Sequence, residues 1–366
     1  MSDLLLTSYV PNRTTGRGLR TCGVIAALAR RGPVEVAWVP FGGGEPAHDL
    51  IEDGRISLRR IDSSRGPRRL LAALLATSRG APWDHSKAVS PEVIATIRGA
   101  AADVRLILDG PSMAAAALPL ARRREAVFLS HNVDSAFRDM PRLRSFERRV
   151  FRGVRESWMC TRADMSAARE LAGDDIGLRL VPNVVDVAAL PHAAERPGKQ
   201  VALFVGDFTY RPNQEGLAYL VDEVMPLVWR ELPEAILNVV GRGVETPPAD
   251  PRVHVLGFVD DLDAEYARAD AVAVPLLSGG GSPLKFIEAL ARGLPVVATS
   301  HAAALIEDGR AGEHFLAAPD AQGFAAALVT VLSGKAGELG LRGRELAQRS
   351  LSVDSLAAQL GDPAPV

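Results

Sequence analysis

The sequence predicts an α/β protein with two doubly wound domains that face each other, each built on a parallel sheet covered by helices. Short apolar runs alternate with helical patterns in both halves of the chain. Several runs are continuously apolar, which is typical of strands buried on both faces of a parallel sheet. Such sheets bind ligands at the carboxyl ends of their strands, so two of them end to end form a cleft and favour an enzyme with two substrates.

The alternation lapses once and then begins again, which sets the domain boundaries. The lapse covers residues 187–199, a stretch that contains Pro, Ala and His and that we interpret as a linker. We therefore expect an N-terminal domain over residues 1–186 and a C-terminal domain over residues 200–349. Residues 350–366 are expected to form a helix and tail that cross back to the N-terminal domain.

In the first half, one helix is expected over residues 19–31, ending at Gly32. Another begins at Ser90, a capping hydroxyl followed by Pro91 at the first helical position and Glu92 in the first turn. Strands are expected over residues 4–10, 34–39, 56–61, 104–108 and 126–129.

In the second half, strands and helices alternate in the same way. Strands are expected over residues 201–205, 236–240, 253–256, 271–274 and 296–298. Helices are expected over residues 214–230 and 284–292, and helical patterns fill most of residues 321–360.

Composition excludes several classes of protein. The 366 residues are 47% hydrophobic and 23% charged, as in an ordinary globular protein rather than a disordered or fibrous one. Two cysteines, Cys22 and Cys160, are too few for a disulfide framework or a thiolate metal site. No apolar run approaches the length of a membrane helix, and the apolar start lacks the layout of a signal peptide. We expect a soluble, cytoplasmic protein.

Charge is distributed unevenly. Residues 1–186 carry 28 Lys and Arg against 21 Asp and Glu, a net charge of +7, whereas residues 187–366 carry 14 against 23, a net charge of −9. A basic half fits an anionic partner or a membrane surface, and it fits compositional drift at least as well. With 5% aromatic residues and no basic groove interleaved with aromatics, nucleic-acid binding is not expected.

The most informative stretch is the glycine-rich segment 278–290, SGGGSPLKFIEAL, which reads as a loop followed by a helix. Exposed N–H groups and the helix dipole make such an N-terminus an anion site, and glycines let a phosphate approach the backbone. Lys285 lies in the first turn, where a cation opposes the dipole, so a bound phosphate would explain it. Glu288 lies one turn further on the same side and suits the hydroxyls of a ribose.

This segment resembles the donor-binding signature of the family-4 retaining glycosyltransferases, which have the GT-B fold. Other stretches resemble that family in the same order along most of the chain. They are residues 16–20 (GRGLR), 130–134 (SHNVD), 181–186 (VPNVVD), 205–216 (VGDFTYRPNQEG), 240–243 (VGRG) and 257–270 (GFVDDLDAEYARAD). Each motif alone is weak, whereas their order and spacing together are specific.

The resemblance implies a nucleotide-sugar donor site in the C-terminal domain. Arg211 and Lys285 would hold the nucleotide diphosphate, Val259 would meet the base through its backbone and Glu288 would bind the ribose. The other donor-site positions implied are Gly16, Gly206, Gly281, Ser282, Pro283 and Leu284.

The resemblance also implies an acceptor site in the N-terminal domain. His131, at a strand end, would contact the transferred sugar or the acceptor, and with Arg211 and Lys285 it forms the expected catalytic set. Arg17, Asn132 and Asp134 are expected to bind the acceptor. Asp109 closes a buried strand, so it either touches the acceptor or caps the following helix.

Three positions depart from the family pattern. Many relatives have Arg at the position of Asp207 and Lys at that of Glu215, so Arg211 is expected to supply much of the charge. Relatives often have Glu, which binds sugar hydroxyls, at the position of Gly280. These departures bear on the choice of donor sugar and on whether the site is active.

Two further motifs have competing interpretations. Asp261-Leu262-Asp263 has the pattern of a metal-binding DxD, but a capped, acidic helix start explains it better. The segment 138–155 carries seven arginines beside an apolar stripe of Leu143, Phe146, Val150 and Val154. It fits a basic helix that touches anionic lipid, and better a solvated face whose apolar stripe packs on its own sheet. No metal site is expected from the histidines, which have no paired ligand spacing.

The sequence thus predicts a retaining, metal-independent transfer of a sugar, with a UDP-sugar favoured as donor, to an acceptor hydroxyl. No cofactor is expected beyond the nucleotide-diphosphate sugar as co-substrate. The acceptor stays open among a small metabolite, a natural-product scaffold and a lipid-linked or polysaccharide chain, with peripheral membrane contact through residues 138–155. Two alternatives are a sugar-nucleotide epimerase on the same fold and a non-catalytic nucleotide-sugar-binding protein.

Overall fold

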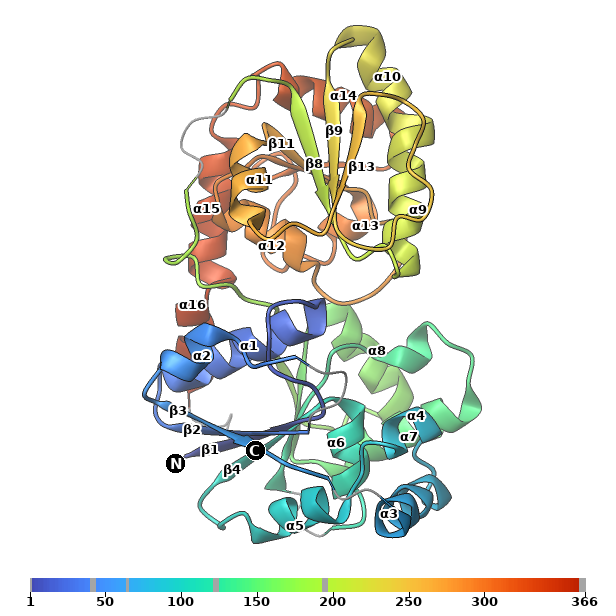
Figure 1. Cartoon of the computed structure of the whole chain (residues 1–366), viewed down its shortest axis with the longest axis vertical. Coiled ribbons are helices and arrows are strands. Elements are labelled where there is room, and N and C mark those ends of the chain that lie inside the picture. Colours follow the sequence, from blue (N-terminus) through green and yellow to red (C-terminus); the bar gives the residue numbers. More distant parts are fainter. Residues whose placement is uncertain (1, 40–43, 64–65, 121–124, 193–196, 362–366) are drawn as a thin grey trace. The chain divides into compact units, whose positions relative to one another are not determined.

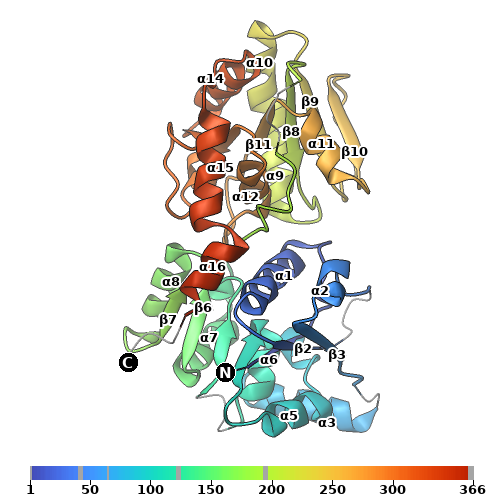
Figure 2. The same ribbon diagram turned by 90° about the vertical axis from the view of Figure 1, so that its left-hand side faces the viewer.

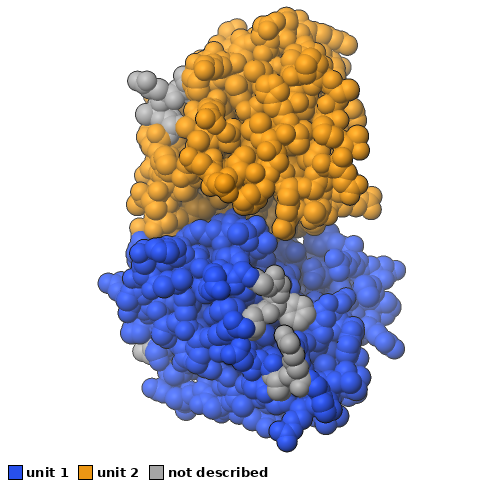
Figure 3. Space-filling view, viewed as in Figure 1, with its two compact units in different colours: residues 1–183, 356–366 blue, residues 184–355 orange. Residues whose placement is uncertain are grey.

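The computed structural model describes residues 2–39, 44–63, 66–120, 125–192 and 197–361, and these form two compact units. Unit 1 comprises residues 1–183 and 356–366, and unit 2 comprises residues 184–355 (Figure 3). The division falls at Asn183 and Val184, three residues before the expected start of the linker, whose residues 193–196 lie outside the described part.

Unit 1 is built on a seven-stranded sheet in the order β3-β2-β1-β4-β5-β6-β7, with every pairing parallel. Its strands are β1 (Asp3–Thr7), β2 (Val34–Trp38), β3 (Ile56–Arg60), β4 (Arg105–Asp109), β5 (Val127–Leu129), β6 (Glu156–Met159) and β7 (Leu178–Leu180). The five strands expected from the sequence are present, with ends shifted by up to three residues.

Helices cover both faces of this sheet. They are α1 (Gly16–Ala29), α2 (His48–Glu52), α3 (Pro67–Ser78), α4 (Trp83–Ser86), α5 (Pro91–Gly99), α6 (Gly110–Ala117), α7 (Pro141–Gly153) and α8 (Arg162–Ala172), with a 3₁₀ turn at Asp134–Ala136. Figure 1 shows α1 and α2 on one side of the sheet and α5 and α6 on the other. Ser90 caps α5 by accepting from the amide of Val93 at 3.3 Å, as the sequence predicts.

Unit 2 repeats the architecture with a six-stranded parallel sheet in the order β10-β9-β8-β11-β12-β13. Its strands are β8 (Val201–Val205), β9 (Ile236–Val240), β10 (Val253–Gly257), β11 (Ala271–Val274), β12 (Val296–Thr299) and β13 (Leu316–Ala318). The helices are α9 (Arg211–Tyr219), α10 (Met225–Glu231), α11 (Leu262–Arg268), α12 (Leu284–Ala291), α13 (Ser300–Ala303), α14 (Ala321–Leu332) and α15 (Leu339–Ser350).

One core of unit 2 joins the sheet to α9, α10 and α14. Phe204 of β8 lies here with Val228 of α10 and Leu328 of α14, all fully buried. On the opposite face α12 packs against α15 (Figure 2). The last helix of the described residues, α16 (Val353–Gln359), follows α15, and its residues from Leu356 onward belong to unit 1. There Arg31, two residues after the end of α1, donates to the carbonyl of Ala357 at 3.1 Å.

Candidate functional site

The carboxyl edge of the unit 2 sheet gathers three turns that the sequence singles out. The turn after β8 begins at Gly206, and its amide donates to the carbonyl of Val240, the last residue of β9, at 2.9 Å. The turn after β9 packs so closely against the first that a Cβ on Gly241 would lie 1.6 Å from the Gly206 carbonyl oxygen. The third turn is the glycine-rich loop 278–283, which leads from β11 into α12.

Lys285, in the first turn of α12, points its ammonium group at the turn after β8. Its Nζ donates to Oδ1 of Asn213 at 2.6 Å and lies 4.7 Å from the centroid of the Phe204 ring. A Cβ on Gly206 would lie 3.2 Å from this nitrogen, so a side chain there would crowd the ammonium group. Burial lowers the pKa of Lys285 to about 7, although the charge of Glu288 opposes that effect.

The glycine-rich loop is fixed by side chains from two helices. Ser278 donates its hydroxyl to Oε2 of Glu215 on α9 at 2.9 Å. Nε2 of His301, on α13, donates to the carbonyl oxygen of Gly279 at 2.8 Å. Gly279 and Gly281 have φ values of +100° and +75°, which a residue with a side chain rarely adopts. Ser282 is buried, and Pro283 stands at the N-cap of α12, directly before Leu284.

The three residues that depart from the family pattern, Asp207, Glu215 and Gly280, all lie at this edge. Asp207 forms an ion pair with Arg242, Nη2 to Oδ2 at 2.8 Å, so a cation of the turn after β9 lies beside it. Burial acts to raise the pKa of Asp207, but hydrogen bonds from Arg242 and Thr209 outweigh it and hold that pKa below its usual value. Gly280 lies in the loop itself, between the two glycines with positive φ.

Arg211 is the first residue of α9, and its side chain is 86% exposed. Its Nε donates to Oε1 of Glu215, one turn along the helix, at 2.7 Å. The hydroxyl of Ser278 and the charge of Arg211 both lower the pKa of Glu215. Glu215 thus connects Arg211 to the glycine-rich loop and offsets its charge.

The two residues expected to meet the nucleoside also lie in unit 2. Glu288 accepts a hydrogen bond from the hydroxyl of Tyr266 on α11, at 3.0 Å. Val259 follows β10, the edge strand of the sheet. The Asp261-Leu262-Asp263 motif is a helix start, as the preferred interpretation predicts, because Asp261 caps α11 by accepting from the amide of Ala264 at 3.0 Å.

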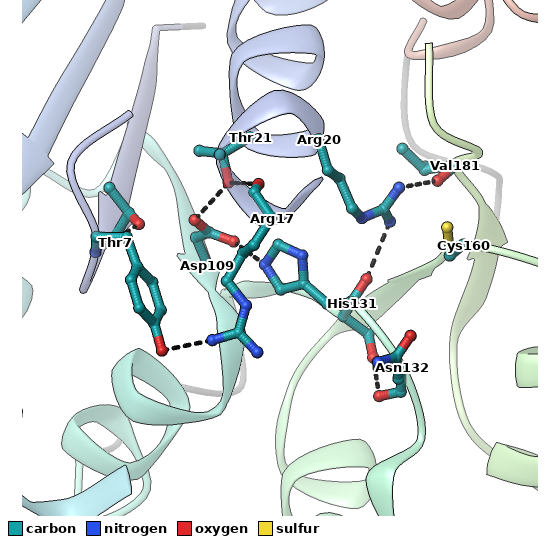
Figure 4. A network of polar contacts seen from close by, with 12 residues as sticks. Thr7, Arg17, Arg20, Thr21, Asp109, His131, Asn132, Cys160 and Val181 are labelled. Atoms are coloured by element: carbon teal, nitrogen blue, oxygen red, sulfur yellow. Dashed lines mark hydrogen bonds and ion pairs between the residues drawn. The ribbon is translucent and has the colours of Figure 1, made fainter. Parts of the chain in front are cut away.

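A second polar cluster lies at the carboxyl edge of the unit 1 sheet (Figure 4). Nε2 of His131, which follows β5, lies 2.6 Å from Oδ1 of Asp109, the last residue of β4. Thr21 of α1 donates to the other oxygen of Asp109 at 2.9 Å. Asp109 makes no side-chain cap for α6, so the capping alternative is wrong: its carboxylate is 1% exposed and turned toward His131.

The electrostatics of this pair favour an ionised carboxylate. Burial would raise the pKa of Asp109, but His131 and the hydroxyls of Thr7 and Thr21 together hold that pKa below its usual value. Burial lowers the pKa of His131, with Asp109 opposing and Arg17 adding to the lowering. Asp109 thereby orients the imidazole with Nε2 as donor.

The other predicted acceptor residues surround His131. Arg17, His131, Asn132 and Asp134 line one recess of about 10 Å³, which holds a single water molecule at most. Arg17, one residue after the start of α1 at Gly16, donates to the Tyr9 hydroxyl at 2.6 Å. A Cβ on Gly16 would meet nothing within 4 Å, so internal packing gives no reason for a glycine there.

Sequence reasoning missed two residues that build these clusters. Asn213 accepts from Lys285 and donates to the carbonyl of Asp207 at 2.7 Å, yet it lies 72 residues before Lys285 in the chain. Arg20 is 3% exposed and donates to the carbonyls of Ser130 and Val181 at 2.9 and 2.8 Å. Asn213 lies in the motif RPNQEG and Arg20 in the motif GRGLR, and these two motifs are the sequence signals that point to them.

A family model and two curated proteins match parts of this chain. Residues 199–334 match the family model described as glycosyl transferases group 1, so unit 2 carries the domain that defines that model. Two curated relatives are phosphatidyl-myo-inositol mannosyltransferases, from Mycolicibacterium smegmatis (32% identical over 205 residues) and Mycobacterium leprae (30% over 202 residues). Each alignment covers 52% of this chain, which spans about half the length of the curated relatives it matches (50% and 52%).

Solved structures confirm the predicted fold class. HepE of Anabaena in complex with UDP and glucose has a TM-score of 0.71 at 14% identity, with 98% of each chain covered. Sucrose-phosphate synthase from Thermosynechococcus elongatus has a TM-score of 0.70 at 19% identity, covering 98% of this chain and 97% of that one. A glycosyltransferase from Rickettsia africae has a TM-score of 0.65 at 12% identity, covering 98% and 96%. The chain has the two Rossmann-like domains of the GT-B fold.

Two further findings on the described residues concern metal ions and membranes. No group of three or more His, Cys, Asp or Glu side chains in them is arranged to hold a metal ion. Within the same part of the chain, no helix has both the length and the apolar character needed to cross a bilayer.

Proposed function

We propose that this protein is a retaining, metal-independent glycosyltransferase of family 4 that moves a sugar from a UDP-sugar to an acceptor hydroxyl. The observation that carries the proposal is the position of Lys285. Lys285 lies at the N-terminus of α12, and its ammonium group is held by the neutral side-chain amide of Asn213 on α9. Burial and the helix dipole both disfavour a cation at this position. A diphosphate at this edge would offset both costs, and the match of residues 199–334 to a glycosyltransferase model supports that ligand.

The chemistry follows from fixed charges and amides rather than from a protein nucleophile. The bond between the anomeric carbon and the diphosphate breaks, and the bond from the acceptor oxygen to that carbon forms. Lys285 and the amides at the start of α12 would stabilise the charge that develops on the departing diphosphate. Approach of the acceptor on the face that the leaving group vacates would retain the configuration, with the hydroxyl proton passing to a diphosphate oxygen.

The remaining site residues take roles in unit 1 and at the nucleoside. His131, oriented by Asp109, would contact the transferred sugar or the acceptor, and Glu288 would bind the ribose. Because Glu215 offsets Arg211, we assign most of the diphosphate contact to Lys285 and the loop amides. Because the curated relatives are named phosphatidyl-myo-inositol mannosyltransferases, phosphatidylinositol and other lipid-linked hydroxyls are the first acceptors to assay. Mannosyl donors should be assayed beside UDP-sugars.

A thermal-shift titration with UDP, GDP, TDP and ADP tests the donor site. The expected result is that UDP raises the melting temperature of the wild type by several degrees, because a ligand that binds only the native state stabilises it by mass action. The Lys285→Ala variant should lose this response, while Lys335→Ala, which removes an exposed lysine of the same unit, should keep it.

Each other outcome has a definite meaning. Stabilisation by a different diphosphate would replace UDP in the proposal. Stabilisation without turnover over the acceptor panel would favour the non-catalytic binding protein. No stabilisation by any of the four nucleotides, with or without magnesium, would refute the donor site.

A further inference from the structure

Helix α3 of unit 1 packs with its small residues inward and its large apolar residues outward. Ala72, Ala73 and Ala76 are buried against the core of the unit. The four leucines, in contrast, are exposed: Leu70 by 52%, Leu71 by 58%, Leu74 by 49% and Leu75 by 45%. A helix whose only apolar partner were its own domain would turn leucines inward, since each buries far more apolar area than alanine.

The leucines form one continuous stripe rather than scattered exposures. Positions 70, 71, 74 and 75 recur at one-turn spacing, so their side chains lie on a single face of the helix. Trp83, the first residue of α4, which packs against α3, is 48% exposed as well. Single exposed leucines are ordinary, but a clustered apolar stripe of this size marks an interaction surface.

The charges around the stripe are mainly positive; Asp84, which follows Trp83, is 82% exposed and is paired with Lys87 at 3.1 Å. Residues 63–83 contain four arginines, at 65, 68, 69 and 79, and no Asp or Glu. Arg68 and Arg79 are exposed at the two ends of α3. Arg149 of α7 reaches the same place, because its guanidinium group donates to the carbonyl of Arg79. The partner of this face therefore has an apolar surface bordered by negative charge.

Helix α7, which the sequence singled out as a basic amphipathic helix, differs from α3 in this respect. Its apolar residues Leu143, Phe146 and Val150 are at most 4% exposed and pack in the core of unit 1. The α7 arginines thus lie beside an apolar stripe that the domain itself covers. α7 contributes charge but no apolar surface, whereas both views of the ribbon place α3 at the periphery of the unit (Figures 1 and 2).

We propose that the Leu70-Leu71-Leu74-Leu75 face of α3 is a membrane-docking surface that inserts its leucines among the acyl chains of an anionic bilayer while Arg68, Arg79 and Arg149 contact the lipid phosphates. A short helix with leucines on one face and arginines at its border has the character of an interfacial helix. Each arginine near an anionic surface adds attraction that salt screens. The residues of this surface are distant from Lys285 in the sequence, so the test of membrane docking does not depend on whether the donor site is correct.

Vesicle co-sedimentation of the full chain tests the proposal. Phosphatidylcholine vesicles that contain phosphatidylglycerol are compared with pure phosphatidylcholine vesicles. The wild type should sediment with the anionic vesicles, and less so as salt is raised. The double variant Leu71→Ser/Leu74→Ser should lose about tenfold or more of its partitioning, because two half-exposed leucines no longer enter the bilayer. Arg68→Ser should weaken binding to anionic vesicles alone.

Matched controls separate docking from folding and from self-association. Leu341→Ser removes a leucine that is 50% exposed on α15 of unit 2, and it should bind vesicles as the wild type does. Because the substituted leucines face outward, the thermal melt of the double variant should match that of the wild type. Equal sedimentation of wild type and double variant, or no wild-type binding to anionic vesicles, would overturn the proposal. If the wild type forms a dimer and the double variant is a monomer, with no difference in vesicle binding, the leucine face binds a second copy of the chain instead.

Discussion

We predict that the ammonium group of Lys285 makes the affinity for the proposed nucleotide-sugar donor depend on pH. Burial places the pKa of this lysine at about 7 in the unliganded protein, against an ordinary value of 10.5. If only the ammonium form binds the diphosphate, the fraction able to bind is about one half at pH 7 and about 1% at pH 9. The dissociation constant for UDP-glucose should then rise about 50-fold between pH 7 and pH 9.

Isothermal titration calorimetry with UDP-glucose measures this directly. The nucleotide sugar is preferred to UDP because its diphosphate is esterified at both ends, whereas a terminal phosphate titrates near pH 6 itself. Lys285→Arg is the matched variant, since a guanidinium group stays charged over the whole range and should give a nearly flat profile. Buffers of different ionisation enthalpy should show proton uptake on binding by the wild type above pH 7 and none by the variant.

The same group has the opposite effect on the stability of the unliganded protein. The folded-state pKa of Lys285 lies below its unfolded value, so the unfolded chain binds more protons between about pH 7 and pH 10.5. The contribution of Lys285 to the free energy of unfolding therefore increases as pH rises through that window. A UDP-glucose affinity that stays constant from pH 7 to pH 9, or that falls equally in Lys285→Arg, would refute the reasoning.

Three further perturbations test other parts of the structure. Gly241→Ala should lower the free energy of unfolding by roughly 2 kcal/mol or more, since φ is +138° and the Cβ would lie 1.6 Å from a carbonyl oxygen. A urea-unfolding midpoint of the variant equal to that of the wild type would contradict this. Asp109→Asn should lower kcat/KM on the order of tenfold and move the acid limb of the pH–rate profile to lower pH, because the carboxylate raises the pKa of His131. An unchanged pH profile would show that the Asp109–His131 pair does not act in catalysis. Glu215→Gln should lower the dissociation constant for UDP about two- to fivefold and steepen the salt dependence of binding, because it frees the charge of Arg211. Weaker UDP binding would show that Glu215 acts mainly by supporting the glycine-rich loop.

Strand ends were predicted best where apolar residues run continuously. β8 and β11 have the ends that the sequence predicts, because each is an unbroken run of apolar residues, Val-Ala-Leu-Phe-Val and Ala-Val-Ala-Val. β6 and β7 were not predicted, since Glu156 and Ser157 interrupt the first and Arg179 the second. β13 was missed because Leu-Ala-Ala is short and weakly inclined to form strands.

The helix expected over residues 214–230 is divided in the structure. It begins at Arg211, three residues earlier, because Pro212 is well placed in a first turn. A π-helical turn at Leu220–Val224 then separates α9 from α10, which carries Pro226 in its first turn. Hydrophobic periodicity alone does not reveal such an interruption, since the apolar face continues through it.

The candidate site could be located from sequence but not assembled from it. Glycines and a lysine at a helix start carry a local signal, so Lys285 and its loop could be predicted as candidates. The partner of Lys285 is Asn213, which tertiary folding brings to it from another helix. Likewise, the sequence showed Glu215 as a departure from the family pattern, while its bonds to Arg211 and Ser278 depend on where α9 meets the loop.

The most direct test of the central claim is a crystal structure of the full chain with UDP. We predict that the diphosphate lies at the N-terminus of α12, with Lys285 Nζ and amides of residues 281–284 within hydrogen-bond distance of its oxygens. The ribose hydroxyls should then lie against Glu288. A UDP molecule bound elsewhere, or one whose diphosphate makes no contact with Lys285, would contradict the account.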